Sequence, residues 1–194
     1  VTGVQTCALP ICGGTTEVAV ISLGGVVTSL SISTGGDELD DALIQFVKKE
    51  YSLMLGERTA EEIKTTVGTA FPTPDESSAE LRGRDLVTGL PRTIVVTAEE
   101  IRRALDEPLT RIVDAVKTTL DRTPPELCGD IMDRGIVLTG GGAMLKGLDE
   151  RLRHETGMPV IIAEQPLNCV VMGSGKCVEE FEALQQVLIS EPRA

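Results

Sequence analysis

Two glycine clusters hold the residue types best suited to contact a phosphorylated ligand. They are Gly13, Gly14 and Thr15, ahead of a β-branched run, and Gly140, Gly141, Gly142 and Ala143, between an apolar run and a helical pattern. Without side chains, backbone N–H groups can approach phosphate oxygens closely, and a helix N-terminus adds favourable partial charge. Neither cluster is a Walker A loop or a G-x-G-x-x-G motif. A plain tight turn explains either alone; both at the edge of one sheet favour a nucleotide.

A second group of candidates lies on one predicted helix, Glu61, Glu62 and Lys64. Glu61 and Lys64 are three positions apart and therefore share a helical face. A solvent-exposed ion pair between them is the simpler interpretation. The run Thr59-Ala60-Glu61-Glu62 has the form of a capping box that opens this helix.

Other reactive residue types form no recognisable site. The single histidine, His154, stands among charged residues of a predicted helix surface, so neither a catalytic triad nor a Cys/His pair is indicated. The five cysteines include no Cys-x-x-Cys pair, which favours reduced thiols over disulfides or zinc. The acidic run at 37–41 is read as charge that complements a helix N-terminus, rather than as a metal site.

Composition excludes several classes of protein. The 194 residues carry a net charge of -12, with 41% hydrophobic and 2% aromatic residues. The apolar content is that of a globular domain with an aliphatic core. An acidic chain without basic stripes is not expected to bind nucleic acid. No uncharged apolar run approaches the roughly 18 residues of a membrane span.

The elements that must position the candidates follow an α/β pattern. A hairpin is predicted at 16–33 around Gly24-Gly25, followed by helices at 38–51 and from 59. Strands are predicted at 80–87 and 92–97, and a helix at 97–120 behind a second capping box, with a kink or restart at Pro108. The last third reads as strand 135–138, glycine loop, helix 144–155, strand 159–163 and helix 170–188. This order predicts a mixed sheet with flanking helices.

Six motifs along the chain carry a family resemblance. They are GGTTEVAVISLGG (13–25), GGDELD (35–40), GERTAEEIK (56–64), RGRDLVTG (82–89), PPEL (124–127) and DRGIVLTGGGA (133–143). Together they resemble the family of the bacterial actin homologue MreB. The resemblance extends without a gap over about residues 13–180. It favours MreB over the sugar kinases and heat-shock chaperones of the same superfamily.

The resemblance implies a fold and a function. It implies the C-terminal half of an actin-like ATPase, with residues 13–36 and 97–180 as a ribonuclease-H-like subdomain, 37–96 as a small inserted α/β subdomain and 181–194 as a tail. It also implies binding of ATP and Mg²⁺, and filaments beneath the inner membrane that guide wall synthesis and maintain rod shape. The implied partners are other protomers and the cell-shape and wall-synthesis proteins of the inner membrane, and the location is cytoplasmic.

Residue roles are implied position by position. Gly13, Gly14 and Thr15 match the second phosphate loop of the family. The helix with Glu61, Glu62 and Lys64 matches the one that contacts adenosine. The loop from Gly140 to Ala143 matches the adenosine loop.

The chain also departs from the family. The family pattern Asp-Ile-Gly-Gly-Gly-Thr reads here Pro10-Ile11-Cys12-Gly13-Gly14-Thr15, without the metal-steadying aspartate. We expect residues 1–12 to be a non-native leader that adds little stability. The first phosphate loop, the water-orienting glutamate and the membrane-contacting element belong to a half that we expect to be missing. The chain alone is therefore expected neither to hydrolyse ATP nor to bind it tightly. A monomeric ATPase of the superfamily and a nucleotide-free interaction domain remain alternatives.

Overall fold

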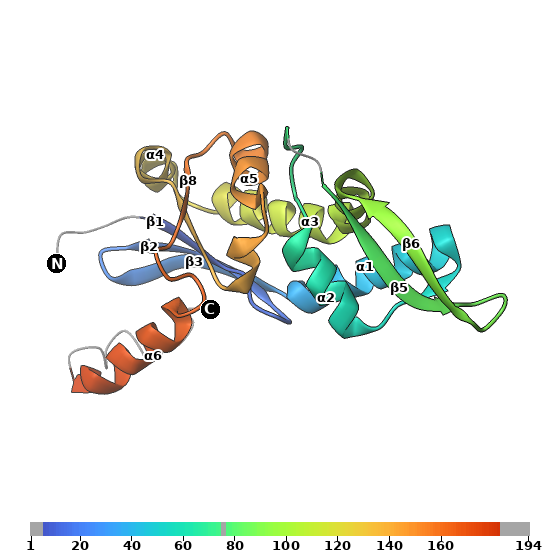
Figure 1. Cartoon of the computed structure of the whole chain (residues 1–194). Helices are drawn as coiled ribbons and strands as arrows, with labels where there is room; N and C mark the ends of the chain where they lie inside the picture. Colours follow the sequence, from blue (N-terminus) through green and yellow to red (C-terminus); the bar gives the residue numbers. More distant parts are fainter. Residues whose placement is uncertain (1–5, 75–76, 183–194) are drawn as a thin grey trace.

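The main sheet is mixed and has five strands. A computed structural model of the chain describes residues 6–74 and 77–182 and orders this sheet β3-β2-β1-β7-β8 (Figure 1). Its strands are β1 (Thr6–Pro10), β2 (Thr16–Ser22), β3 (Gly25–Ile32), β7 (Ile136–Thr139) and β8 (Val160–Ile162). β1 pairs antiparallel with β2 and parallel with β7, and β7 pairs parallel with β8. The predicted mixed sheet is confirmed.

The β2–β3 hairpin turns one residue earlier than the sequence suggested. Its turn is Leu23-Gly24 rather than Gly24-Gly25, and both turn residues have positive φ, 51° and 81°. Two consecutive positive φ values are typical of the turn that matches the twist of paired strands. Leu23 adopts this conformation with its side chain 81% exposed.

β1 is the central strand of the sheet, which argues against the expectation that residues 1–12 add little stability. Cys7, Leu9 and Ile11 are completely buried, between β2 on one side and β7 on the other. Burial raises the pKa of the Cys7 thiol to about 12, so this thiol stays protonated. Pro10 stands at the last position of the strand, where its missing N–H removes only one possible ladder donor.

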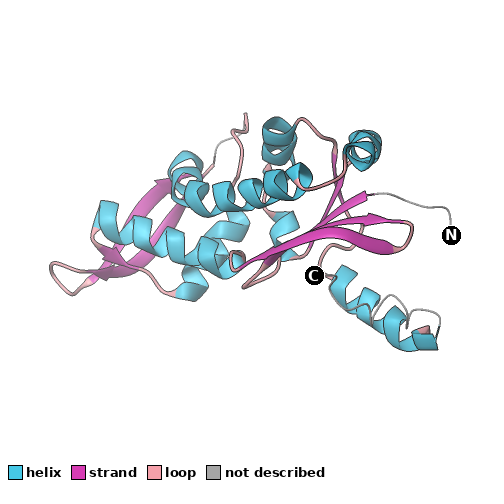
Figure 2. Cartoon of the chain, turned by 180° about the vertical axis from the view of Figure 1, so that it is seen from behind, coloured by secondary structure: helices cyan, strands magenta, loops and turns pink. Residues whose placement is uncertain are grey.

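Three helices cover one face of this sheet (Figure 2): α3 (Ala98–Asp121), α4 (Pro125–Arg134) and α5 (Leu148–Thr156). The predicted capping box of α3 is present, with Thr97 and Glu100 each accepting from the other's backbone N–H. The helix runs through Pro108 without a break, so no restart occurs there. The buried aliphatic side chains of α3 supply much of the core.

The region after the glycine triplet differs from the single helix predicted at 144–155. Residues Gly141–Met144 form a short 3-10 turn, and α5 begins only at Leu148.

The last described helix, α6 (Cys169–Glu179), lies on the opposite side of the sheet from α3, and none of its side chains is buried (Figure 1). The helix predicted to reach 188 ends at Glu179 with Glu180 as its C-cap, and residues 183–194, which include most of the expected tail 181–194, lie outside the described residues. No described helix combines the length and the apolar character that crossing a bilayer requires.

A second, three-stranded sheet stands beside the first and has the order β4-β5-β6. The part of the chain from 36 to 97 contains this sheet and two helices. Their order is α1 (Gly36–Tyr51), β4 (Leu53–Met54), α2 (Glu57–Thr66), β5 (Ser78–Asp85) and β6 (Pro91–Thr97). α2 begins at Glu57, after Gly56 as N-cap, so the capping box predicted at Thr59 is wrong. Thr59 lies within the first turn, because the helix starts two residues before it.

Candidate functional site

A pocket of about 680 Å³ opens between one end of the main sheet and helices α1 and α2. It is surrounded by the β1–β2 loop, the start of α1, one face of α2 and the 3-10 turn after β7. Its lining residues are Cys12, Gly13, Gly36, Asp37, Leu39, Asp40, Glu57, Arg58, Glu61, Lys64, Thr65, Gly141, Gly142, Met144, Leu145 and Leu167. We call this cavity the central pocket. It brings together Gly13, Glu61, Lys64, Gly141 and Gly142, five of the residues singled out from the sequence.

The first glycine cluster forms a tight loop that is fixed to the start of α1. Cys12 N–H donates to Thr15 O at 2.9 Å and so closes the loop. Gly36 N–H donates to Cys12 O, also at 2.9 Å, which holds the loop against the helix N-terminus. Gly13, Gly14 and Thr15 are all exposed, and only Gly13 lines the pocket. Their backbone is therefore accessible to a ligand.

The contact between this loop and α1 depends on Gly35. A Cβ at Gly35 would lie 2.4 Å from Gly13 O, closer than such atoms come in proteins. The Asp37 carboxylate lies beside the same loop, 3.5 Å from where a Cβ of Gly13 would be. The sequence indicated only helix N-terminal charge and a family resemblance for the motif at 35–40, and the structure shows that it forms one wall of the pocket.

The second glycine cluster packs against the end of β1. Gly140 has a φ of 81°, and a Cβ there would lie 2.2 Å from Ile11 O. A Cβ at Gly142 would lie 2.3 Å from Ile11 Cγ2, and Gly142 N–H donates to Ile11 O at 2.9 Å. Gly141 and Gly142 reach the central pocket, whereas Gly140 and Ala143 are buried behind it. The absence of side chains thus permits close packing and leaves a flat backbone facing the cavity.

Lys64 is held by α1 and not by its neighbour on α2. Its Nζ donates to Asp40 Oδ2 at 2.7 Å and to Gly36 O at 2.9 Å. Both side chains of the pair are largely buried, at 13% and 14% exposed. The expected solvent-exposed ion pair between Glu61 and Lys64 is therefore wrong in its partner: Lys64 joins two helices instead.

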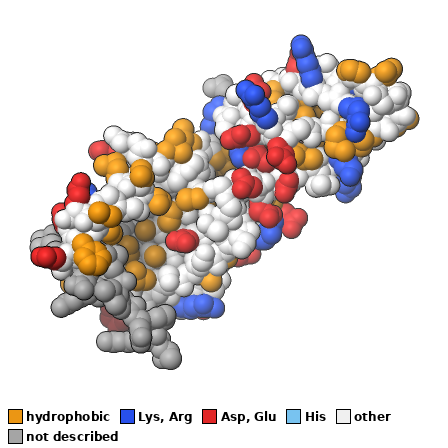
Figure 3. Space-filling model, turned by 90° about the horizontal axis from the view of Figure 1, so that it is seen from below, with side chains coloured by type: hydrophobic (Ala, Val, Ile, Leu, Met, Phe, Trp, Pro, Cys, Tyr) orange, Lys and Arg blue, Asp and Glu red, His pale blue; other side chains and the backbone are white. Residues whose placement is uncertain are grey.

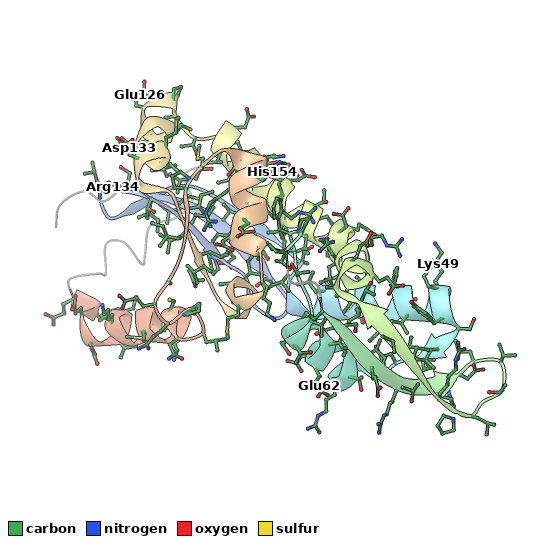
Figure 4. The ribbon with its side chains drawn as sticks, turned by 45° about the horizontal axis from the view of Figure 1, so that its top comes forward. Lys49, Glu62, Glu126, Asp133, Arg134 and His154 are labelled. Carbon is green, nitrogen blue, oxygen red and sulfur yellow. The ribbon has the colours of Figure 1, made fainter. Side chains whose placement is uncertain are left out.

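Glu61 and Glu62 lie on the more exposed part of α2. Glu61 borders the central pocket. Glu62 does not, and it borders a shallow hollow on the outer side of α2 together with Arg58, Glu61 and Thr65. Figure 4 shows Glu62 on the lower side of α2, exposed to solvent. The structure thus separates Glu62 from Lys64 and from the central pocket, although it remains beside Glu61.

Charge in the central pocket is predominantly acidic. The lining contains four carboxylates, Asp37, Asp40, Glu57 and Glu61, but only the two cations Arg58 and Lys64. Acidic side chains gather over the middle of the molecule in the view from below (Figure 3). Burial raises the pKa of Asp40, and the hydrogen bond from Lys64 offsets part of that shift. Asp40 Oδ1 is buried without a hydrogen-bond partner.

Several lining residues were not found from the sequence. Leu39, Met144, Leu145 and Leu167 give the pocket an apolar side, and no local signal distinguishes them from core residues.

His154 lies outside the central pocket. It is exposed on α5, as predicted, and the centre of its ring lies 5.6 Å from that of Phe71 (Figure 4). Across residues 6–74 and 77–182, no three His, Cys, Asp or Glu side chains are grouped so as to hold a metal ion.

The sequence of almost the whole chain matches one family model, described as MreB/Mbl protein, over residues 4–186. The chain belongs to the MreB/Mbl family. The predicted resemblance is confirmed, and it separates the chain from sugar kinases and chaperones. Its extent was underestimated, because the match includes residues 4–12, which we expected to lie outside the family.

Individual MreB and Mbl proteins are identical to this chain at about half of the matched positions. Cell shape-determining protein Mbl of Bacillus cereus (strain ATCC 10987 / NRS 248) is 52% identical over 172 residues, covering 89% of this chain and 52% of the relative. Cell shape-determining protein MreB of Escherichia coli (strain K12) is 51% identical over 179 residues, covering 92% and 52%. The chain therefore spans about half the length of the curated relatives that it matches.

Solved structures confirm the actin-like fold. The crystal structure of MreB5 of Spiroplasma citri bound to ADP superposes with a TM-score of 0.89 at 36% identity, covering 94% of this chain and 55% of that one. The double helical filament of MamK gives a TM-score of 0.74 at 21% identity, over 90% of this chain and 54% of that one. The second similarity concerns the fold alone.

Proposed function

We propose that this chain supplies one half of the nucleotide site of a cell shape-determining, actin-like filament protein. The observation that carries this proposal is the central pocket, where both glycine clusters and the Lys64 helix converge. The similar MreB5 of Spiroplasma citri has been solved with ADP and with AMPPNP, which supports an adenine nucleotide as the ligand.

The residues divide into an adenosine end and a phosphate end. At the adenosine end we place the flat backbone of Gly141 and Gly142, the apolar Leu145 and Leu167, and the Glu61–Lys64 face of α2. A planar base suits an apolar wall with a few polar groups. At the phosphate end we place the exposed backbone of Gly13, Gly14 and Thr15. Gly140 and Ala143 support the adenosine loop from behind, and Glu62 lies outside this arrangement.

The chain lacks the aspartate that would steady a magnesium ion. Pro10 stands where the family pattern has its metal-steadying aspartate, and the described carboxylates of the pocket form no metal-binding group. Mg²⁺ prefers octahedral oxygen ligands and is usually bound through carboxylates and substrate phosphates. We therefore propose no Mg²⁺ ligand among the described residues of this chain.

Filament formation is the activity that we propose for the complete protein. Membership of a cell-shape family and the actin-like fold support self-association of protomers. The further parts of the proposal are a cytoplasmic location beneath the inner membrane and contact with cell-shape and wall-synthesis proteins there. The division into subdomains at 13–36 with 97–180 and at 37–96 remains part of this proposal, with the pocket between the two.

The nucleotide proposal is tested by titrating the ¹⁵N-labelled chain with ADP at millimolar concentration. We expect amide shifts at Gly13, Lys64, Gly141 and Gly142, and none in the hairpin turn around Gly89. Calorimetry with Mg²⁺ and ATP should give a dissociation constant weaker than micromolar, since each missing charge-assisted contact is worth about 1.5–3 kcal/mol. Amide shifts confined to other regions, or micromolar affinity, would contradict the proposal in its present form.

A matched pair of variants locates the site. A Cβ at Gly141 would meet only Leu167 Cδ2, at 3.5 Å, so Gly141→Leu should fold while filling the pocket. Gly129 in α4 has open space around its Cβ position and lies outside the pocket, so Gly129→Leu is the control. We expect loss of the ADP-induced shifts in the first variant only. Pelleting of a full-length protein containing this sequence, with and without ATP, tests the filament proposal.

A further inference from the structure

We propose that Asp40 is a positioning residue of the central pocket, whose carboxylate fixes the Lys64 ammonium group at the wall where the nucleoside binds. This inference rests on the proposed nucleotide function. It concerns a residue on α1 that acts through a residue on α2.

The geometry leaves Lys64 little freedom. Its ammonium group lies between Asp40 Oδ2 at 2.7 Å and Gly36 O at 2.9 Å, one turn apart on α1. The pair is 13% and 14% exposed, so water does not compete freely for either group. An ammonium group has three donors, and these contacts use two of them. The third is left for an acceptor on a ligand in the pocket that Lys64 lines.

The same contact connects the two ends of the proposed site. Gly36 accepts from Lys64 through its carbonyl, and its N–H donates to Cys12 O of the phosphate-end loop at 2.9 Å. The position of Lys64 is therefore tied, through a single residue, to the loop that carries Gly13. A change at Asp40 that releases Lys64 would alter the adenosine end without removing any atom from the phosphate end.

The energetics favour a role in placing charge over a role in stability. Burial raises the pKa of Asp40, and its Oδ1 is buried without a partner, so the carboxylate is costly where it stands. Buried ion pairs often stabilise a fold no better than well-packed apolar residues do. What the pair provides is a cation held at a defined point of a predominantly acidic pocket.

A double-mutant cycle on the 194-residue chain tests the inference, with ADP dissociation constants measured from the amide shifts. Asp40→Asn keeps the shape of the side chain and removes its charge. We expect it to weaken ADP binding about tenfold, the effect of about 1.4 kcal/mol, within the range of a charge-assisted hydrogen bond. In a Lys64→Met background the same substitution should change binding by less than about twofold, because interacting residues are not additive. Asp41→Asn, on the exposed side of α1, is the matched control.

The outcomes separate this inference from the function on which it rests. If the unaltered chain shows no ADP shifts in the pocket, the proposed function fails. If it binds ADP, and Asp40→Asn weakens binding equally with and without Lys64, Asp40 does not act through Lys64. An unchanged affinity in Asp40→Asn overturns the inference as well.

A measurement on the unaltered chain covers the case in which Asp40→Asn does not fold. The ¹H–¹⁵N ammonium resonance of Lys64 should be protected from solvent exchange and should shift with ADP. Lys117, whose pair with Glu155 is 46% and 38% exposed, provides the reference for an unprotected ammonium group. Equal exchange at Lys64 and Lys117 would show that Asp40 does not hold Lys64.

Discussion

The hydroxyl of Tyr51 donates a 2.5 Å hydrogen bond to Glu100 Oε1 and so joins the last turn of α1 to the first turn of α3. The other oxygen of Glu100, Oε2, accepts from Thr97 N–H at 2.9 Å and completes the capping box. One carboxylate therefore caps a helix of the main sheet and fixes the helix that carries Asp40. This hydrogen bond raises the pKa of Tyr51 and lowers that of Glu100.

Tyr51→Phe should destabilise the chain by about 0.5–1 kcal/mol, the usual net value of a partly exposed hydrogen bond. Because the pKa of Glu100 is lowered in the folded state, its contribution is present above the unfolded pKa and is lost as pH falls through the folded one. Urea unfolding at pH 7 should show the difference between Tyr51→Phe and the unaltered chain, and unfolding near pH 3 should show a smaller one. An equal difference at both pH values would mean that the tyrosine acts through packing alone.

The buried central strand leads to a second prediction. Leu9 is completely buried in β1, so Leu9→Ala should cost about 2–5 kcal/mol through lost burial and the remaining cavity. Leu23→Ala makes the same chemical change at a side chain that is 81% exposed, and should stay within about 0.5 kcal/mol. Denaturant unfolding of both variants measures the contrast. Similar small losses would restore the view that residues 1–12 contribute little.

The elements that depend on neighbouring residues could be predicted from the sequence, whereas the position of β1 could not. The β2–β3 hairpin and the α3 cap depend on residues within a few positions of one another. β1 instead depends on pairing with β7, whose residues 136–139 lie far along the chain. Its Thr6 and Pro10 argue locally against a central strand, and only the long-range register shows that Cys7, Leu9 and Ile11 face the core.

The glycine residues of the candidate site could be predicted from the sequence. The contact between the two helices α1 and α2 could not. Gly140 and Gly142 are visible because close packing against Ile11, at the end of β1, admits no side chain. Gly13 is visible only as part of its glycine cluster, since a Cβ there would meet nothing closer than the Asp37 carboxylate at 3.5 Å. The Asp40–Lys64 pair joins residues 24 positions apart on two helices, and helical spacing instead suggested Glu61 as the partner. No spacing rule within one helix can identify a contact that two helices form by packing.

The β5–β6 turn gives a pH prediction. Asp85 accepts from the backbone N–H groups of Thr88 and Val87 and from Arg92, and these contacts lower its pKa to about 2. A lowered folded pKa means that the stabilisation is fully present above about pH 4, the unfolded value, and is lost as pH falls towards 2. Asp85→Asn should therefore be less stable than the unaltered chain at pH 6, by a margin that shrinks below pH 4. Asp114→Asn makes the same chemical change on the exposed side of α3, away from this turn, and is the matched control.

The last prediction separates backbone strain from close packing in the glycine loop. Gly140 and Gly24 both have a φ of +81°, but a Cβ at Gly24 would meet nothing within 4 Å, whereas one at Gly140 would lie 2.2 Å from Ile11 O. Gly24→Ala should therefore cost only the strain of a left-handed residue, about 1–2 kcal/mol. Gly140→Ala adds a collision with the central strand and should cost clearly more, since neither β1 nor the loop can move without breaking the Gly142–Ile11 hydrogen bond. Equal losses of unfolding free energy in the two variants would show that the loop does not depend on its contact with β1, and that the wall of the pocket is less constrained than its geometry indicates.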